Sequence, residues 1–311
     1  MKNNFKDIVM KYKALLGLLV LCIVMAILSP RFLTVPNIKN VLTQVSVNAI
    51  IAIGMTFVIL TGGIDLSVGS TLAISGAVAA TLIKANCSIL VAIIVAIIVG
   101  IIVGLVNGVV IAKGKIQAFI ATLATMTVFR GVTQVYTNGT PVSKLGEAFG
   151  KIGNTEIIGI PLPVVITIAV FLVAFYVLNE TRCGRYIYAL GGNEDSARLS
   201  GINTTKMKML VYVISGVTAA ISGVVVTSRI GSASAIAGTG YELDAIAAVV
   251  LGGTSLAGGE GSIAGTIIGA LIIGVLNNGL NLLNVSPYYQ LIVKGLVILL
   301  AVMVDRKANK K

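Results

Sequence analysis

Long apolar runs separated by short polar stretches extend along almost the whole chain. A membrane-spanning helix needs about 20 predominantly apolar residues. Ten segments fit or approach this length, namely 14–30, 40–64, 66–83, 85–112, 117–137, 162–178, 209–228, 244–257, 261–283 and 288–304. The apolar residues form unbroken blocks instead of ten-residue alternations, which argues against a β-barrel. The pattern predicts an all-α integral membrane protein with about ten transmembrane helices, in which segment 244–257 forms either a span or a half-helix.

The composition points the same way. The chain is 57% hydrophobic and only 11% charged, which is more apolar surface than one soluble core could bury. Its 35 glycines suit closely packed transmembrane helices. The first apolar block follows several lysines and lacks a small-residue cleavage pattern, so we expect it to remain as a signal anchor. Residues 1–311 are therefore predicted to form one multi-pass transmembrane domain.

Basic residues are concentrated in one set of loops. The formal net charge of +12 would suit nucleic-acid binding, but the cations are scattered between apolar blocks, so we exclude that partner. With both termini and the loop 179–208 in the cytoplasm, the inside carries Lys2, Lys6, Lys11, Lys13, Lys113, Lys115, Arg182, Arg185, Arg198, Lys206, Lys208, Arg306, Lys307, Lys310 and Lys311. The outside then carries Arg31, Lys39, Lys84, Lys144, Lys151 and Arg229. Because cytoplasmic loops carry an excess of Lys and Arg, this orientation is the one we predict.

A glycine-rich stretch with a carboxylate, LTGGIDLSVGS at 60–70, interrupts the second and third apolar segments. A carboxylate inside a membrane is costly and usually faces a polar interior. The stretch is either a helix break that lines a pathway or a tight turn that places Asp65 near a helix N-terminus, and both can hold together. The residues that this pathway or helix break would use are Gly62, Gly63, Asp65, Ser67 and Gly69.

A second glycine-rich stretch begins with Gly252 and Gly253, and five glycines in ten residues cannot form a rigid helix. Like residues 60–70, this stretch is either a helix break that lines a pathway or a turn, here on the cytoplasmic side. Residues 62–69 resemble 252–259, and 104–107 resemble 274–277. Two related halves are common in transporters. Chance similarity between glycine-rich membrane segments is the alternative to such an internal repeat.

The loop 179–208 contains one short predicted helix. Asn193 can cap this helix, Glu194 and Asp195 would occupy its first turn, and Gly201 would end it. Basic residues flank it on both sides. The loop is either a docking site for a cytoplasmic partner or a solvated connecting helix.

Several kinds of chemistry are missing from the sequence. There is no histidine, and the three cysteines are too widely spaced to indicate a disulfide framework or a metal site. No phosphate-binding loop occurs, because Gly114–Lys115 lacks the upstream glycine of that motif. Arg130 and Lys294 lie within apolar segments, where long side chains usually snorkel to an interface. We therefore predict no catalytic, cofactor-binding or metal-binding residues.

Four stretches carry a resemblance to a known family. They are NAIIAIGMTFVILTGGIDLSVGS at 48–70, QAFIATLATMTVFRGVTQVYTNG at 117–139, GRYIYALGGNEDSARLSGI at 184–202 and GTGYELDAIAAVVLGGTSLAGGEGSIAGTIIGALIIGVLNNGLNLL at 238–283. They resemble the membrane permeases of bacterial ribose ABC importers, and the similarity extends from about residue 15 to residue 305. Related monosaccharide permeases share the glycine motifs.

The resemblance implies a permease that forms the passage for a monosaccharide, ribose first, in the bacterial cytoplasmic (inner) membrane and among its lipids. Its implied partners are a second copy of itself, an extracytoplasmic sugar-binding protein and a separate ATP-binding subunit that uses the ATP. We expect no cofactor to bind this chain itself. By the same resemblance, the cytoplasmic loop couples to the ATPase through Gly191, Asn193, Glu194, Ala197, Leu199 and Gly201.

Two other functions remain in view. A proton-coupled secondary sugar transporter could use Asp65 as its proton carrier. An intramembrane enzyme would need a nucleophile with a base or a metal set, and without histidine the chain offers no convincing one.

Overall fold

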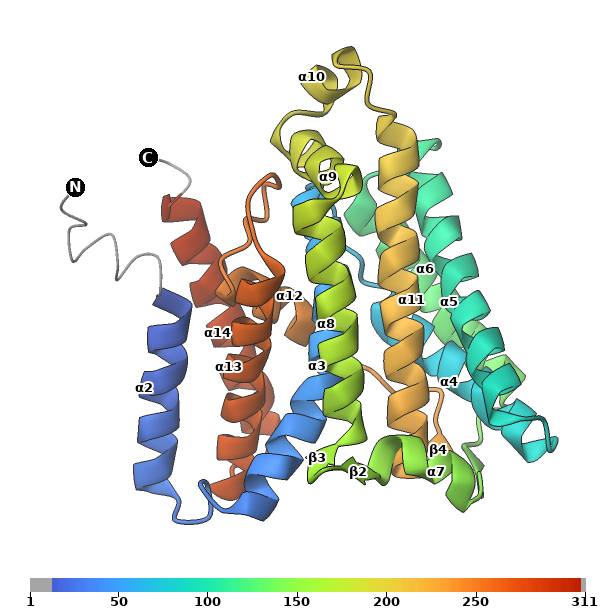
Figure 1. The fold of residues 1–311 in the computed structure, drawn as a ribbon, viewed down its shortest axis with the longest axis vertical. Coiled ribbons are helices and arrows are strands. Elements are labelled where there is room, and N and C mark those ends of the chain that lie inside the picture. Colours follow the sequence, from blue (N-terminus) through green and yellow to red (C-terminus); the bar gives the residue numbers. More distant parts are fainter. Residues whose placement is uncertain (1–12, 309–311) are drawn as a thin grey trace.

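The computed structural model describes residues 13–308 as a bundle of helices (Figure 1). The helices are α2 (Lys13–Leu28), α3 (Val35–Leu60), α4 (Val68–Lys84), α5 (Ile89–Ala112), α6 (Ala118–Tyr136), α7 (Glu147–Asn154), α8 (Leu162–Glu180), α9 (Arg182–Gly192), α10 (Glu194–Leu199), α11 (Thr204–Ile230), α12 (Tyr241–Leu251), α13 (Ile263–Leu282) and α14 (Pro287–Ala308). Four two-residue strands are β1 (Val142–Ser143), β2 (Glu156–Ile157), β3 (Ile160–Pro161) and β4 (Ser232–Ala233). They form two antiparallel pairs, β1 with β4 and β2 with β3.

Each of the ten predicted apolar segments contains a helix. Within residues 13–308, six of these helices are long and apolar enough to cross a membrane, namely α3, α5, α6, α8, α11 and α13. Helices α2, α4 and α14 have shorter apolar lengths. The segment predicted as a span or a half-helix contains α12, whose 11 residues extend about 16 Å. This length makes α12 a half-helix.

Helices α3 and α11 form the centre of the bundle (Figure 1). Both are largely buried, and α11 packs most closely against α5. Gly100 and Gly216 make this approach possible, because a Cβ atom on either glycine would overlap the carbonyl oxygen of the other. Small residues at contacts between transmembrane helices give close packing where lipid removes the hydrophobic driving force.

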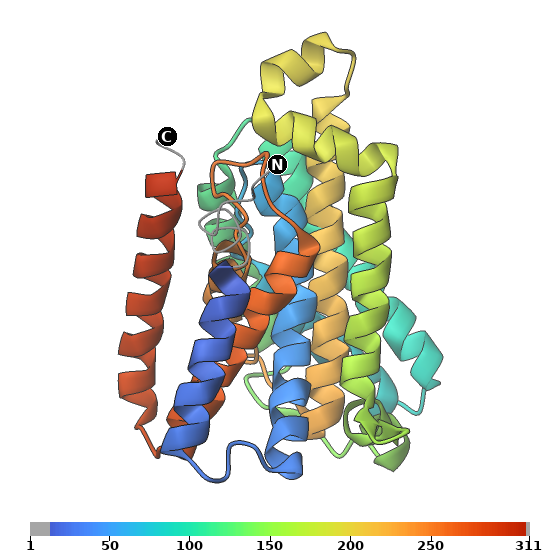
Figure 2. The same cartoon turned by 60° about the vertical axis from the view of Figure 1, so that its left-hand side comes forward.

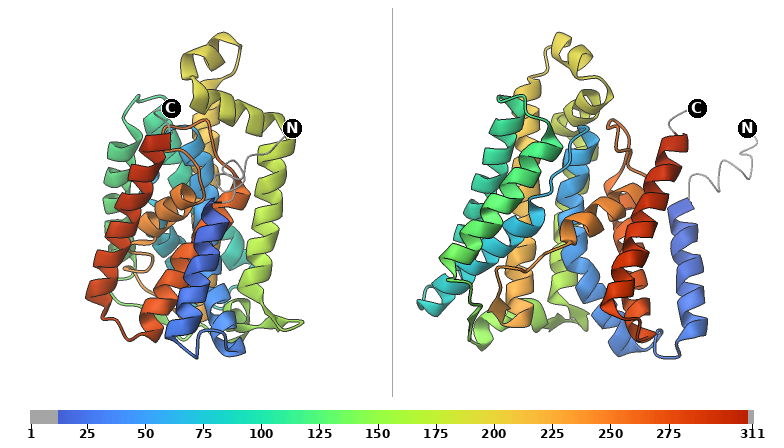
Figure 3. Two further views of the ribbon diagram at one scale, coloured as in Figure 1. Left: turned by 90° about the vertical axis from the view of Figure 1, so that its left-hand side faces the viewer. Right: turned by 180° about the vertical axis from the view of Figure 1, so that it is seen from behind.

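A helix, a short non-helical segment and a second helix occur in that order twice, in opposite directions. Helix α3 runs toward the end of the bundle that holds α9 and α10, and residues 61–67 then return toward the middle before α4 begins (Figure 3). Helix α11 runs away from that end, and residues 231–240 return before α12 begins (Figure 3). Inverted repeats with broken helices are common in transporters.

This arrangement tests the two sequence pairings of the internal repeat. Residues 104–107 lie in α5 and residues 274–277 lie in α13, the helices that follow α4 and α12, so this pairing is consistent with the structure. The pairing of 62–69 with 252–259 is wrong. Residues 62–69 begin between α3 and α4, and their structural counterpart is 231–240 between α11 and α12. Shared glycines caused the error.

The start of α2, the end of α14 and the pair α9–α10 lie toward the same end of the bundle, and α10 extends beyond the long helices (Figure 2). The basic residues Lys2, Lys6, Lys11, Lys310 and Lys311, which the predicted orientation places inside, lie outside the described residues. At the opposite end α7 packs on α11, where the Ser228 hydroxyl donates to the Phe149 carbonyl (2.6 Å).

Candidate functional site

The turn after α3 is built by two glycines. Gly62 has a φ of 74°, a conformation that glycine adopts without steric cost. The Gly63 N–H donates to the Val58 carbonyl (3.1 Å), which closes the end of α3. Asp65 then accepts a hydrogen bond from the Ser67 N–H (3.0 Å), and α4 begins at the next residue. The glycine-rich stretch therefore ends one helix and starts another.

Asp65 lies at the centre of this junction and is only 1% exposed. Its Oδ1 accepts hydrogen bonds from the Ser67 N–H and from the Ser67 hydroxyl (2.6 Å). Its Oδ2 accepts a hydrogen bond from the Ser215 hydroxyl on α11 (2.7 Å). A buried carboxylate is tolerated when such donors replace water. These contacts support the turn interpretation of Asp65.

The hydrogen bonds continue to two further helices. The Asn107 amide of α5 donates to the Ser67 hydroxyl (2.8 Å), and the Thr125 hydroxyl of α6 donates to the Asn107 carbonyl oxygen (2.7 Å). We call Asp65, Ser67, Asn107, Thr125 and Ser215 the Asp65 junction. It joins α4, α5, α6 and α11 through buried polar contacts, which fix relative positions when every member is satisfied.

Sequence reasoning included Asp65 and Ser67 but missed the other three members of the Asp65 junction. Asn107 entered only as part of the internal repeat. The available signal was the polar side chains within otherwise apolar segments, but the sequence does not say which helix faces which. The partner of Asp65 on α11 lies 150 residues away along the chain.

The first turn of α4 touches the segment that leads into α12. A Cβ atom on Gly69 would overlap the Gly238 carbonyl oxygen and would crowd the Glu242 carboxylate. Gly69 is therefore required by the meeting of the two broken helices. Gly69 was among the residues predicted for the pathway or helix break, but its partner could not be predicted from the sequence.

The second glycine-rich stretch packs against the end of α3. The Gly259 N–H donates to the Leu60 carbonyl (2.9 Å), and a Cβ atom on Gly191 of α9 would overlap the same carbonyl oxygen. Gly252 packs against the Gly265 backbone of α13, and Gly253 has a φ of 90°. Four predicted glycines, Gly62, Gly191, Gly252 and Gly253, thus lie in loops or at helix ends.

Helix α9 is tied to this loop by a tyrosine. The Tyr188 hydroxyl donates to the Gly261 carbonyl (2.8 Å). Burial raises the pKa of the Tyr188 phenol above its ordinary value, so it remains a proton donor at neutral pH. This hydrogen bond consequently holds the loop after α12 against helix α9.

The short helix predicted in the loop 179–208 is confirmed as α10. The Asn193 side chain caps it by accepting from the Ser196 N–H (2.8 Å), and Gly201 follows its end with a φ of 84°. Leu199 is 88% exposed, as an apolar anchor for a partner would be. Ala197 is only 4% exposed, because it lies on the inner face of this turn. Ala197 therefore packs against other residues of this chain and is not part of the exposed surface.

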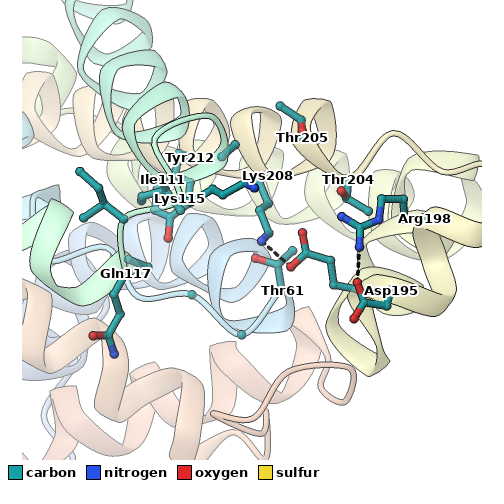
Figure 4. Close-up of a pocket in the computed structure, with 16 residues that line it drawn as sticks. Thr61, Ile111, Lys115, Gln117, Asp195, Arg198, Thr204, Thr205, Lys208 and Tyr212 are labelled. Atoms are coloured by element: carbon teal, nitrogen blue, oxygen red, sulfur yellow. Dashed lines mark hydrogen bonds and ion pairs between the residues drawn. The ribbon is translucent and has the colours of Figure 1, made fainter.

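One ion pair joins α10 to α11, and a second lies within α10 (Figure 4). Glu194 pairs with Lys208 of α11 (2.6 Å), and Asp195 pairs with Arg198 within α10. Exposed pairs of this kind contribute up to about 1 kcal/mol each. Glu194 therefore has a role beyond the helix dipole, since it joins α10 to the start of α11.

The two cations within apolar segments have partners in the protein and do not snorkel. Lys294 of α14 pairs with the buried carboxylate of Asp244 on α12 (3.0 Å). Arg130 of α6 donates to the carbonyls of Ala235 and Ala237 (2.7 Å each), in the segment before α12. Sequence reasoning missed Asp244, whose position at the start of an apolar segment was the available signal.

Comparison with known proteins gives one family. Residues 37–302 match the family described as the permease component of a branched-chain amino acid transport system. The chain belongs to this permease family. No solved structure matches it.

Curated relatives in the permease family are similar over nearly the whole chain. The ribose import permease protein RbsC of Escherichia coli (strain K12) is 58% identical over 96% of this chain and 94% of its own length. The protein of the same name from Bacillus subtilis (strain 168) is 54% identical over 98% and 96%. The D-allose transport system permease protein AlsC of Escherichia coli is 43% identical over 96% and 93%. This chain is therefore a multi-pass membrane permease.

Proposed function

We propose that this chain is the translocation subunit of an ATP-driven ribose importer in the bacterial inner membrane. The observation that carries the proposal is the gradient of identity among its relatives. Those named for ribose are 53–58% identical to it, whereas the relative named for D-allose is 43% identical over a similar length. Sugar selection would also involve a binding protein on the outer side of the membrane.

The proposed orientation has ten membrane segments, with both termini and α9–α10 in the cytoplasm. The distribution of basic residues supports it, with 15 on the proposed inside and six on the proposed outside. Reporter fusions after Thr204 and at Lys311 test it, and both should report the cytoplasm. An external signal at either position would contradict the ten-segment arrangement.

Coupling to ATP hydrolysis would occur through α10. No phosphate-binding loop is present in the sequence, so a separate ATP-binding subunit must supply the energy. The exposed Leu199 offers that subunit an apolar anchor, and Gly191, Asn193, Glu194 and Gly201 shape the helix and its base. Ala197 supports α10 from the inner side.

The passage would lie between two copies of this chain. Helices α6 and α14 flank α12 and the segment before it on one side of the bundle (Figure 3). The polar groups of that side, Asp244, Lys294 and Arg130, suit a hydrated route for a neutral sugar. A second copy placed there would separate these groups from lipid.

The contacts of Asp65 support a fixed hydrogen-bond acceptor over a proton carrier. Three donated hydrogen bonds favour the charged form of the carboxylate and fix its orientation. Vesicles containing this chain alone should therefore show no sugar uptake when a pH gradient is imposed. Uptake under those conditions would establish the secondary-transporter alternative.

Uptake of labelled sugars tests the assignment directly. Cells that lack this chain should lose uptake of labelled ribose and recover it when the chain is restored, while uptake of labelled D-allose serves as the comparison. Normal ribose uptake together with loss of D-allose uptake would move the substrate to another monosaccharide.

A further inference from the structure

A cavity of about 450 Å³ opens beside α10 (Figure 4). Its walls come from four parts of the chain: the turn at 61–63, the end of α5 with the loop 115–118, helix α10, and the start of α11. Figure 4 shows Gln117 and Lys115 on one side, with Asp195 and Arg198 on the other. Sites for small molecules are concave and about 300–1,000 Å³ in volume, so the cavity has a suitable size.

The charges around the cavity favour an anion. The cavity is lined by three cations, Lys115, Lys208 and Arg198, and by two carboxylates, Glu194 and Asp195. Each carboxylate is already paired with a cation of its own. Lys115 has no ion pair among residues 13–308. The lining therefore has one cation in excess.

The N-terminus of α6 adds partial positive charge to the same wall. Gln117 and Ala118 line the cavity, and the first turn of this 19-residue helix receives no hydrogen bond from a capping side chain. The free N–H groups at a helix N-terminus and the helix dipole both favour a bound anion.

A buried hydroxyl without a partner provides independent support for a ligand. Tyr212 lines the cavity and is 1% exposed, yet its hydroxyl has no hydrogen-bond partner in the structure. It lies beside Gly63, which belongs to the same wall. Buried tyrosine hydroxyls normally find a partner, and a hydroxylated ligand would supply one. Three threonines, Thr61, Thr204 and Thr205, also line the cavity.

We propose that this cavity binds a phosphorylated monosaccharide from the cytoplasm. The phosphate would lie near Lys115 and the N-terminus of α6, and the sugar hydroxyls would reach the threonines and Tyr212. The cavity lies between α10 and the turn that leads to the Asp65 junction. A ligand there restrains α10 relative to α11 and so slows import when phosphorylated sugar accumulates. This regulatory consequence rests on the proposed function, whereas the binding itself does not.

Titration calorimetry on the purified chain in lipid nanodiscs tests the binding, with ribose 5-phosphate, inorganic phosphate and ribose as separate probes. Ribose 5-phosphate should bind at least tenfold more tightly than either other probe. Lys115→Met should weaken its binding about tenfold, because one charge-assisted contact is lost. Lys113→Met is the matched control, since it removes the same charge two residues away from a side chain that does not line the cavity. The control should change the affinity less than twofold.

A second variant examines the hydroxyl contacts. Tyr212→Phe should weaken the binding of ribose 5-phosphate several-fold and leave the affinity for inorganic phosphate unchanged. Absence of ribose 5-phosphate binding, equal binding of inorganic phosphate, or equal effects of Lys115→Met and Lys113→Met would each overturn the proposal. These binding measurements need neither the ATPase nor transport, so a negative result would not change the conclusion about ribose uptake by cells. Conversely, if the uptake experiment showed that ribose is not the substrate, the measured affinities for ribose 5-phosphate would still hold.

Discussion

The two helix breaks share one plan but are held in different ways. After α3, the Asp65 junction closes the break with hydrogen bonds among buried side chains of the core. After α11, the break is held by the pairing of β4 with β1 and by Arg130 of α6, and Lys294 of α14 holds the first turn of α12 that follows. Ile236 in this second break is 69% exposed, whereas Asp65 is almost fully buried.

This difference indicates which break can move during transport. Helix α6 contacts both breaks, through Thr122 and Arg130. Within residues 13–308, helix α14 forms an ion pair only at the second of them, so motion of α14 against the core would alter the Lys294–Asp244 contact directly. The first break has additional bonds within the core, to Ser67 of its own turn and to Ser215 of α11. Regions with few buried contacts open at lower free energy than densely bonded ones. We therefore infer that the break after α3 is a fixed joint and that the break after α11 is the mobile one.

The largest expected effect on stability comes from Asp65→Leu. The change leaves buried donors at Ser67 and Ser215 without an acceptor, at a cost of about 1–3 kcal/mol for each unsatisfied group. The protein should unfold at a clearly lower temperature in detergent and reach the membrane in small amounts. Asp65→Asn keeps an acceptor and should be milder. A variant Asp65→Leu with wild-type unfolding temperature and uptake would reduce the Asp65 junction to an ordinary turn.

Lys294→Met should have the next largest effect. It leaves the buried Asp244 carboxylate without its cation, although the half-buried position of Lys294 reduces the cost through solvent screening. We expect membrane levels within twofold of wild type and ribose uptake lowered about tenfold. The double variant Asp244→Asn, Lys294→Met should be less impaired than Lys294→Met alone. Strictly additive effects would show that the pair does not act as a unit.

Arg130→Met should have a smaller effect. Its hydrogen-bond partners are two neutral carbonyl groups, which water can bond once the guanidinium is removed, and its charge also attracts the Glu242 carboxylate. Unfolding temperature should fall by less than in Asp65→Leu, and uptake should fall only a few-fold. A loss of stability as large as that of Asp65→Leu would place both breaks in the same rigid core.

Leu199→Asp should leave stability unchanged, because the side chain is exposed on α10. It should weaken association with the ATP-binding subunit about tenfold, since an apolar anchor becomes a charge. Ile158→Asp is the matched control, an exposed apolar residue in the β2–β3 turn at the other end of the bundle. Co-purification of the tagged permease with the ATPase measures both variants. Equal retention in both would assign coupling to another surface.

The sequence predicted the ten apolar helices because most apolar blocks are long and bounded by charges. It missed α7, and it assigned one helix to the loop 179–208 where the structure has both α9 and α10, because these short helices have no continuous apolar block. It also predicted α10, since the cap by Asn193 and the stop at Gly201 are local signals. It could not predict that Ala197 faces inward, because orientation of a six-residue helix depends on what lies beneath it. The partners of Lys294 and Arg130 were missed for a related reason, as they lie 50 and more than 100 residues away.

Hydrogen exchange on the permease in nanodiscs tests the central claim most directly, because it compares the two breaks in one molecule. The amides of residues 62–70 should exchange at least about tenfold more slowly than those of residues 234–244, as expected for buried and bonded groups against a partly exposed segment. Addition of the ATPase and ATP should change exchange in 234–244 and leave 62–70 unchanged. Equal exchange in the two segments, or a nucleotide response confined to 62–70, would contradict the assignment of the fixed and mobile breaks.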